Sequence, residues 1–279
     1  MDSDSALRYT HVCADHPALG HSEAISRAIA MKPSQLNIAL LIDADNAPAD
    51  KIESILTEIA KHGVANIRRA YGNWTKPNLK HWQACLHEYA IRPVQQFDYT
   101  KGKNATDAAL IIDAMDLLYT RKLDAFAIVS SDCDFTPLVM RILTNGLKAY
   151  GFGESKTPSP FVRACSTFLY LETIDQTSEL EANQISTDAA KNTSGMRKAG
   201  KLLKQDTKLM NLLRGAIAST KELDEWARLS AIGVHIKNQA SFDARNYGYA
   251  KLSNLFEAID TFETCRKPKG VYVRCRKKN

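Results

Sequence analysis

The sequence has no run of about 20 apolar residues, the length that a helix needs to cross a membrane. Its first 34 residues also lack the basic start and apolar stretch of a secretory signal. The six cysteines include no C-x-x-C pair, so neither a disulfide framework nor a structural zinc site is indicated. We therefore expect a protein without a membrane segment that works in a reducing, cytoplasmic setting.

The charge of the chain is concentrated at one end. The 279 residues are 44% hydrophobic and 24% charged, enough apolar material for about two soluble domains. Net charge is +6, yet residues 176–279 alone hold nineteen bases and eleven acids, and the last fourteen residues hold seven bases and no acid. A basic end beside a near-neutral body indicates a polyanionic partner, with a solvated charged tail as the alternative.

From Asn37 onward, short apolar runs alternate with helical apolar stripes. The run 37–42 (NIALLI) ends directly at Asp43, which predicts a buried parallel strand. Further strands are predicted near 66–71, 91–97, 125–130 and 147–151, with an edge strand at 168–171. Helices are predicted near 49–62, 77–90, 105–120 and 135–145. This alternation predicts an α/β domain around a parallel sheet flanked by helices.

The remaining segments differ in composition from this α/β pattern. We divide the chain into an N-terminal extension (1–35), an α/β domain (36–173), a linker (174–203) and a small C-terminal domain with a basic tail (204–279). The C-terminal domain shows three helical patterns and a final short strand, which suggests a winged-helix-like module. Met31 lies just before the first predicted strand, so residues 1–30 are expected to be dispensable.

Aspartates follow two predicted strands at the points where the strands end. The first strand runs into Asp43-Ala-Asp45-Asn46, and the strand at 125–130 runs into Ser130-Ser131-Asp132-Cys133-Asp134. In open parallel sheets, ligands bind outside the carboxyl ends of the strands, near the switch in strand order. If the two strands are neighbours, Asp43, Asp132 and Asp134 meet at one rim. Asp45 is expected to cap the helix that begins near Pro48.

A further acid enters from the helix predicted at 105–120. Asp107 lies on the apolar stripe that continues at Leu110, so it points to the rim of the sheet, whereas Asp113 and Asp116 face elsewhere and are expected to be solvated. Clustered carboxylates need cations, and oxygen ligands suit Mg²⁺ or Mn²⁺. Two such ions can support phosphodiester cleavage. The alternative is that these acids are only turn and cap residues.

Three blocks resemble the signature blocks of NYN domains, here of the LabA-like branch of the PIN-like nucleases: IDADN at 42–46, KGKNATD at 101–107 and VSSDCDF at 129–135. The resemblance covers about residues 36–172 and implies a PIN-like, Rossmannoid fold with a metal-dependent nuclease site. Carried over by position, the implied acids are Asp43, Asp107, Asp132 and Asp134, supported by Asn46 and Ser130. Ser131 and Cys133 depart from the family pattern and leave the acids in place. The resemblance also implies products with a 5′-phosphate and a 3′-hydroxyl.

A second resemblance covers about residues 204–275, which are similar to OST-HTH (LOTUS) domains. It is carried by Trp226-x-x-Leu229-x-x-x-Gly233 and by the segment 241–252 (SFDARNYGYAKL). That family implies a winged helix associated with RNA binding and with nuclease partners, which favours RNA over DNA as the substrate. We expect Trp226, Phe242 and Leu252 to belong mainly to the core.

RNA-binding candidates are predicted in both domains. They are Arg68, Lys101 and Lys103 near the acids, and Arg245, Lys251, Arg274 and Arg276 in the C-terminal domain. For Tyr71 and Trp74, stacking on unpaired bases and packing in the core are both open.

The leading hypothesis is a metal-dependent ribonuclease with an RNA-binding appendage. A non-catalytic RNA-binding or adaptor protein is the main alternative. A haloacid-dehalogenase-like phosphatase is a third hypothesis, because Asp43-Ala-Asp45 follows an apolar strand, although Asn46-Ala-Pro replaces the Gly-Thr or Gly-Val of that mechanism. The edge strand would also permit a homo-oligomer.

Overall fold

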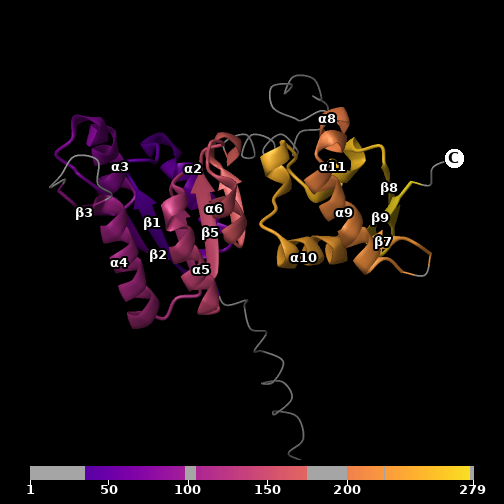
Figure 1. Cartoon of the computed structure of the whole chain (residues 1–279), viewed down its shortest axis with the longest axis horizontal. Helices are drawn as coiled ribbons and strands as arrows, with labels where there is room; N and C mark the ends of the chain where they lie inside the picture. The colour runs from indigo at the N-terminus through magenta and orange to yellow at the C-terminus, as the bar shows by residue number, and fades with distance from the viewer. Residues whose placement is uncertain (1–34, 98–104, 175–199, 223, 277–279) are drawn as a thin grey trace, which may run out of the picture. The chain divides into compact units, whose positions relative to one another are not determined.

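The computed structural model describes residues 35–97, 105–174, 200–222 and 224–276 (Figure 1). The predicted N-terminal extension, apart from Gln35, and most of the predicted linker lie outside these residues. Among the described helices, none is long and apolar enough to cross a membrane.

Six parallel strands form one sheet, as predicted. They are β1 (Leu36–Asp43), β2 (Gly63–Gly72), β3 (Arg92–Gln95), β4 (Ala125–Val129), β5 (Lys148–Gly153) and β6 (Thr167–Tyr170). The helices between them are α2 (Ile52–Ala60), α3 (Trp82–Glu88), α4 (Ala105–Thr120), α5 (Thr136–Thr144) and α6 (Ser159–Ala164), with 3-10 turns η1 (Ala49–Lys51), η2 (Pro77–His81) and η3 (Cys133–Phe135). Only α6 has no counterpart in the sequence prediction.

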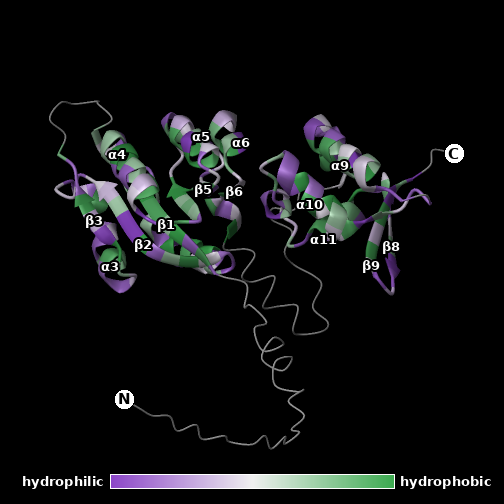
Figure 2. Ribbon diagram, turned by 90° about the horizontal axis from the view of Figure 1, so that it is seen from below, coloured by the Kyte–Doolittle hydropathy of each residue, from purple (hydrophilic) through white to green (hydrophobic). Residues whose placement is uncertain are grey.

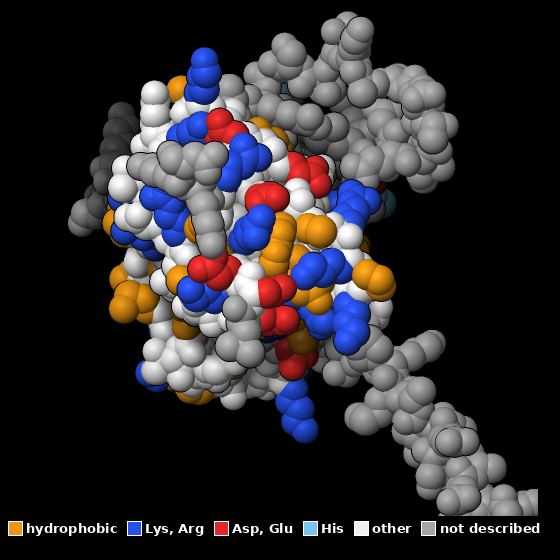
Figure 3. All heavy atoms as spheres, turned by 90° about the vertical axis from the view of Figure 1, so that its right-hand side faces the viewer, with side chains coloured by type: hydrophobic (Ala, Val, Ile, Leu, Met, Phe, Trp, Pro, Cys, Tyr) orange, Lys and Arg blue, Asp and Glu red, His pale blue; other side chains and the backbone are white. Residues whose placement is uncertain are grey.

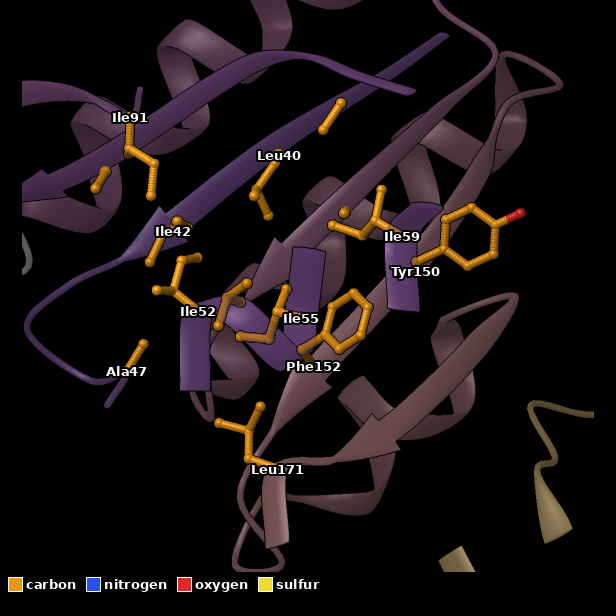
Figure 4. Packing of buried hydrophobic residues seen from close by; sticks show 14 of the residues in the cluster. Leu40, Ile42, Ala47, Ile52, Ile55, Ile59, Ile91, Tyr150, Phe152 and Leu171 are labelled. Carbon is orange, nitrogen blue, oxygen red and sulfur yellow. The ribbon is translucent and has the colours of Figure 1, made fainter. Parts of the chain in front are cut away.

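Helices cover both faces of the sheet, which explains why the first strand is a continuous apolar run. Leu40 and Ile42 of β1 gather on one face with Ile55 of α2 (Figure 4). Leu41 of β1 packs on the other face with Leu110 of α4. Figure 2 shows α4, α5 and α6 on one side of the sheet and α3 on the opposite side. A strand with one face in solvent would alternate apolar and polar residues, whereas both faces of β1 are covered by helices.

The strand order is β3-β2-β1-β4-β5-β6. The chain builds outward from β1 to β3, crosses back through α4, and continues on the other side of β1 with β4. β1 and β4 are therefore neighbours, with Ile42 opposite Val129. This is the switch in strand order at which the carboxyl ends of two strands open a crevice. Both predicted D-x-D segments begin there.

The C-terminal part has a core of its own. It consists of α8 (Gly200–Gln205), α9 (Thr207–Thr220), α10 (Leu229–Gln239), η4 (Ala244–Tyr247) and α11 (Leu252–Ala258), with an antiparallel sheet of β7 (Ala227–Arg228), β9 (Gly270–Cys275) and β8 (Phe262–Lys267) in that order. Leu213, Ile232, Phe256 and Val273 are fully buried in its centre. Helices followed by a β-hairpin agree with the small module that the sequence predicts.

Candidate active site

Asp43, the last residue of β1, lies at the centre of the acidic rim and is fully buried. Its Oδ2 accepts hydrogen bonds from Asn46 Nδ2 (2.9 Å) and Ser130 Oγ (2.8 Å). Its Oδ1 is buried and has no hydrogen-bond partner among the described residues. Burial raises the pKa of Asp43 and outweighs the opposing effect of the two hydrogen bonds. A buried carboxylate oxygen without a donor is costly, so a cation at Oδ1 would stabilise the site.

Asp107 reaches the same rim from the first turn of α4, and only 8% of it is exposed. Burial is the largest cause that raises its pKa to about 6, and the charges of Asp43, Asp132, Asp134 and Asp45 raise it further. The four acids from the two D-x-D segments therefore lie close enough to Asp107 to raise its pKa. The structure brings together all four acids that the sequence analysis selected.

Asp45 also belongs to this cluster, although the sequence analysis expected it to cap a helix. The helical turn after it starts beyond Pro48 and has no side-chain cap. Instead, Asp45 Oδ2 accepts a hydrogen bond from Thr106 Oγ1 (3.0 Å), and Asp45 Oδ1 lies 3.3 Å from Lys76 Nζ. The cap prediction is wrong because α4 places Thr106 within reach of Asp45, which the local sequence around Pro48 does not reveal.

The loop after β4 supplies the remaining two acids. Ser130 is fully buried, and its Oγ, besides donating to Asp43, accepts a hydrogen bond from the backbone N–H of Asp132 (3.1 Å). Asp132 Oδ1 caps η3 by accepting from the N–H of Asp134 (2.9 Å). Ligand atoms of Asp132, Cys133 and Asp134 lie within 4.8 Å of one another. Ser130 thus fixes Asp43 and the Asp132 loop to each other.

This donor set fits a divalent cation that prefers oxygen ligands, such as Mg²⁺ or Mn²⁺. The carboxylates come from β1, from α4 and from the loop after β4, and the buried Oδ1 of Asp43 still lacks a partner among the described residues. Positive charge would also relieve the repulsion that raises the pKa of Asp107. The residues present are therefore compatible with a bound metal.

Three of the predicted RNA-binding arginines have protein partners. Arg274, on β9, donates to the part-exposed Glu263 (2.8 Å), whereas Arg68 and Arg245 are held more tightly. Arg68 lies in the middle of β2 and donates to the carbonyls of Ala65 (3.0 Å) and Tyr89 (2.8 Å). Arg245 donates to both carboxylate oxygens of Glu58, at 2.6 and 2.8 Å, and also to Asp243. These bonds give the guanidinium groups of Arg68 and Arg245 a role inside the protein, so we do not propose that these two residues bind RNA.

The other predicted cations lie at different places. Lys251 is exposed directly before α11, and Arg274 and Arg276 lie on β9 and just after it. Lys101 and Lys103 fall outside the described residues, so their role stays a prediction.

The aromatic residues at the end of β2 and just after it, Tyr71 and Trp74, are structural in this fold. Tyr71 is fully buried and donates its hydroxyl to Asp113, which also accepts from Arg69. The indole Nε1 of Trp74 donates to the carbonyl of Val94 (3.1 Å). The prediction that Asp113 is solvated is therefore wrong: α4 packs across β2 as well as β1, so this side of the helix also meets the sheet.

Comparisons with known families agree with this organisation. The NYN domain model matches residues 37–172, and the OST-HTH/LOTUS domain model matches residues 200–274. The chain therefore contains an NYN domain followed by an OST-HTH/LOTUS domain. These models do not distinguish the LabA-like branch from other NYN domains, so membership of that branch stays a prediction.

Comparisons with individual proteins add little. No curated protein matches the chain significantly. One solved structure, a protein of unknown function from Vibrio parahaemolyticus RIMD 2210633, is 18% identical, covers 50% of this chain and 95% of its own, and has a TM-score of 0.42. At that score it supports no conclusion.

Proposed function

We propose that the protein is a metal-dependent ribonuclease whose C-terminal domain binds the RNA. The observation that carries the proposal is the convergence of Asp43, Asp107, Asp132 and Asp134 at the switch in strand order, where one buried carboxylate oxygen lacks a partner among the described residues. NYN domains are generally nuclease-like and LOTUS domains bind RNA, which supports phosphodiester cleavage of RNA as the reaction.

The four acids would hold Mg²⁺ or Mn²⁺, with Asp43 at the centre. When bound, such an ion supplies Lewis acidity, which makes water a better nucleophile and stabilises charge on the phosphate. Asn46 and Ser130 occupy Oδ2 of Asp43 and leave Oδ1 for the metal. Following the family resemblance, the products would carry a 5′-phosphate and a 3′-hydroxyl.

Cleavage of end-labelled single-stranded and structured RNA tests the proposal. Wild type, Asp43→Asn and the control Asp116→Asn are compared in Mg²⁺, Mn²⁺ and EDTA; Asp116 is exposed on the same helix as Asp107. We expect metal-dependent cleavage by wild type and by Asp116→Asn, and a loss of at least about 100-fold in Asp43→Asn.

Two other outcomes would replace the proposal. RNA binding without cleavage under any metal would make the protein an adaptor. A phosphoenzyme trapped on Asp43 would identify a phosphatase of the haloacid-dehalogenase type instead.

A further inference from the structure

One face of the three-stranded sheet carries cations and aromatic rings. Successive side chains of a strand point to opposite faces, and Ala227 of β7 and Val273 of β9 are fully buried on the inner face. Arg228 and Tyr272, which pair with each other across β7 and β9, belong to the outer face, where Tyr272 is covered by its neighbours and only 5% exposed. Arg274 lies on that same face two residues after Tyr272. The outer face of this sheet, opposite the core of the domain, therefore carries cationic side chains.

Arg274 and a third cation, Lys267 of β8, lie over the ring of Trp226. The guanidinium carbon of Arg274 is 4.5 Å from the ring centroid, and the ammonium of Lys267 is 5.5 Å from it. Lys267 also lies 4.8 Å from the centroid of Tyr272, whose hydroxyl accepts a hydrogen bond from Arg228 (3.3 Å). We call Trp226, Arg228, Lys267, Tyr272 and Arg274 the Trp226 face.

The structure overturns the expectation that Trp226 belongs to the core. Its ring is half-buried, and it precedes β7 at the margin of the sheet. Phe242 and Leu252, by contrast, pack against the buried cluster as expected. Trp226 therefore lies beneath charged side chains at the surface, although it belongs to the same sequence motif as core residues.

Acids balance part of the charge on this face. Lys267 lies 3.2 Å from Asp224, and Arg274 lies 2.8 Å from Glu263. The three bases of the Trp226 face, Arg228, Lys267 and Arg274, still outnumber these two acids. In Figure 3, which views the side on which β7, β8 and β9 lie in Figure 1, Lys and Arg side chains surround hydrophobic ones, with Asp and Glu between them. The excess of bases favours a polyanion over an acidic or neutral partner.

We propose that the Trp226 face binds unpaired RNA, an inference that rests on the proposed function in taking RNA as the polyanion. The guanidinium of Arg274 lies over the Trp226 indole, so an exposed base would stack on this layered pair, while ammonium groups meet phosphates. In a duplex the faces of the bases are covered by their neighbours, so a stacking surface selects single strands. Because every base has such a face, binding tolerates changes in sequence.

Fluorescence anisotropy tests this proposal in the full chain carrying Asp43→Asn, so that the RNA stays intact. The probes are a labelled single strand of mixed sequence and the same strand annealed to its complement. Adding Trp226→Leu should weaken single-strand binding about 10-fold or more, and Trp226→Phe should restore most of it, because a ring is retained. Lys267→Gln should reduce the slope of log K against log salt by about 0.7. Lys208→Gln, an exposed position on α9, is the charge-matched control and should leave both values near those of the parent.

Several results would overturn the proposal. They are no RNA binding by the parent, unchanged single-strand binding by a folded Trp226→Leu variant, or duplex binding that is as tight as single-strand binding and is weakened equally by Trp226→Leu. If Trp226→Leu does not fold, as judged by its melting curve, the comparison of Lys267→Gln with Lys208→Gln decides. Cleavage by the chain with Asp43 intact is scored separately. A chain that cuts RNA but does not need Trp226 refutes only this surface, whereas Trp226-dependent binding without cleavage refutes only the nuclease.

Discussion

Replacing Asp107 with asparagine should stabilise the metal-free protein. In the fold the pKa of Asp107 rises from 3.8 to about 6, so ionising this group at neutral pH costs about 3 kcal/mol of folding free energy. Solvent reaches the rim at the exposed Asp134, and screening lowers this to about 2 kcal/mol. Asparagine also loses up to about 1 kcal/mol of favourable interaction with the start of α4. The net gain should be about 1–2 kcal/mol.

The sign of the pH dependence follows from the raised pKa. The folded state binds the proton of Asp107 more tightly than the unfolded chain does, so the contribution of Asp107 to stability is greatest below about pH 4 and is lost as pH rises through about 6. Asparagine does not titrate. The stability difference between variant and wild type should therefore be largest above pH 7 and smaller by about 2 kcal/mol at pH 4. Taking the difference cancels the titration of shared groups that do not interact with Asp107.

Calorimetry in EDTA at pH 7.5 and pH 4 measures this difference. At pH 7.5 we expect the melting temperature of Asp107→Asn to exceed that of wild type by about 3–6 °C, with Asp116→Asn close to wild type. Adding Mn²⁺ should raise the melting temperature of wild type more than that of Asp107→Asn. The reasoning fails if Asp107→Asn is less stable than wild type at pH 7.5, or if the difference is the same at both pH values.

Three further predictions follow from contacts around the site and between distant parts of the chain. Ser130→Ala removes the hydroxyl that fixes Asp43, so metal-supported cleavage should fall about 10–100-fold, most clearly at subsaturating Mn²⁺. Arg245→Ala leaves the buried carboxylate of Glu58 with weaker partners and should lower the free energy of unfolding, measured with urea, by about 3 kcal/mol. Adding Glu58→Gln to this variant should recover part of that loss. Mn²⁺ and protons compete for Asp107, so Mn²⁺ affinity measured by calorimetric titration should fall as pH decreases from 7.5 to 5.5; equal affinity across this range would contradict the assignment.

The fold was predictable because its strands and helices have strong local signals. The run at 37–42 is apolar throughout, and a strand buried on both faces has that pattern. The helix at 105–120 matches α4 in full. The short helix α6 was missed because six residues that include Pro160 give too little periodicity to detect.

The candidate site was predictable in part. A D-x-D segment follows each of two strands, and the two segments meet at one rim of the sheet if those strands are neighbours. The strand order confirms that β1 and β4 are neighbours. The partners of individual residues depend on tertiary contacts instead. Asp45 meets Thr106 across 61 positions of sequence, and Arg245 meets Glu58 across 187. No local pattern carries such pairings, so the local sequence predicts a cap at Asp45 and an RNA contact at Arg245.

The central claim is that the carboxylates at the rim hold a divalent cation. Electron paramagnetic resonance of free Mn²⁺ during titration with the protein measures this directly, in wild type, Asp43→Asn and Asp116→Asn. We predict that wild type and Asp116→Asn bind at least one Mn²⁺ per chain, that Mg²⁺ displaces it, and that Asp43→Asn loses this binding. Equal Mn²⁺ binding by all three chains, or none by wild type at neutral pH, would contradict the account.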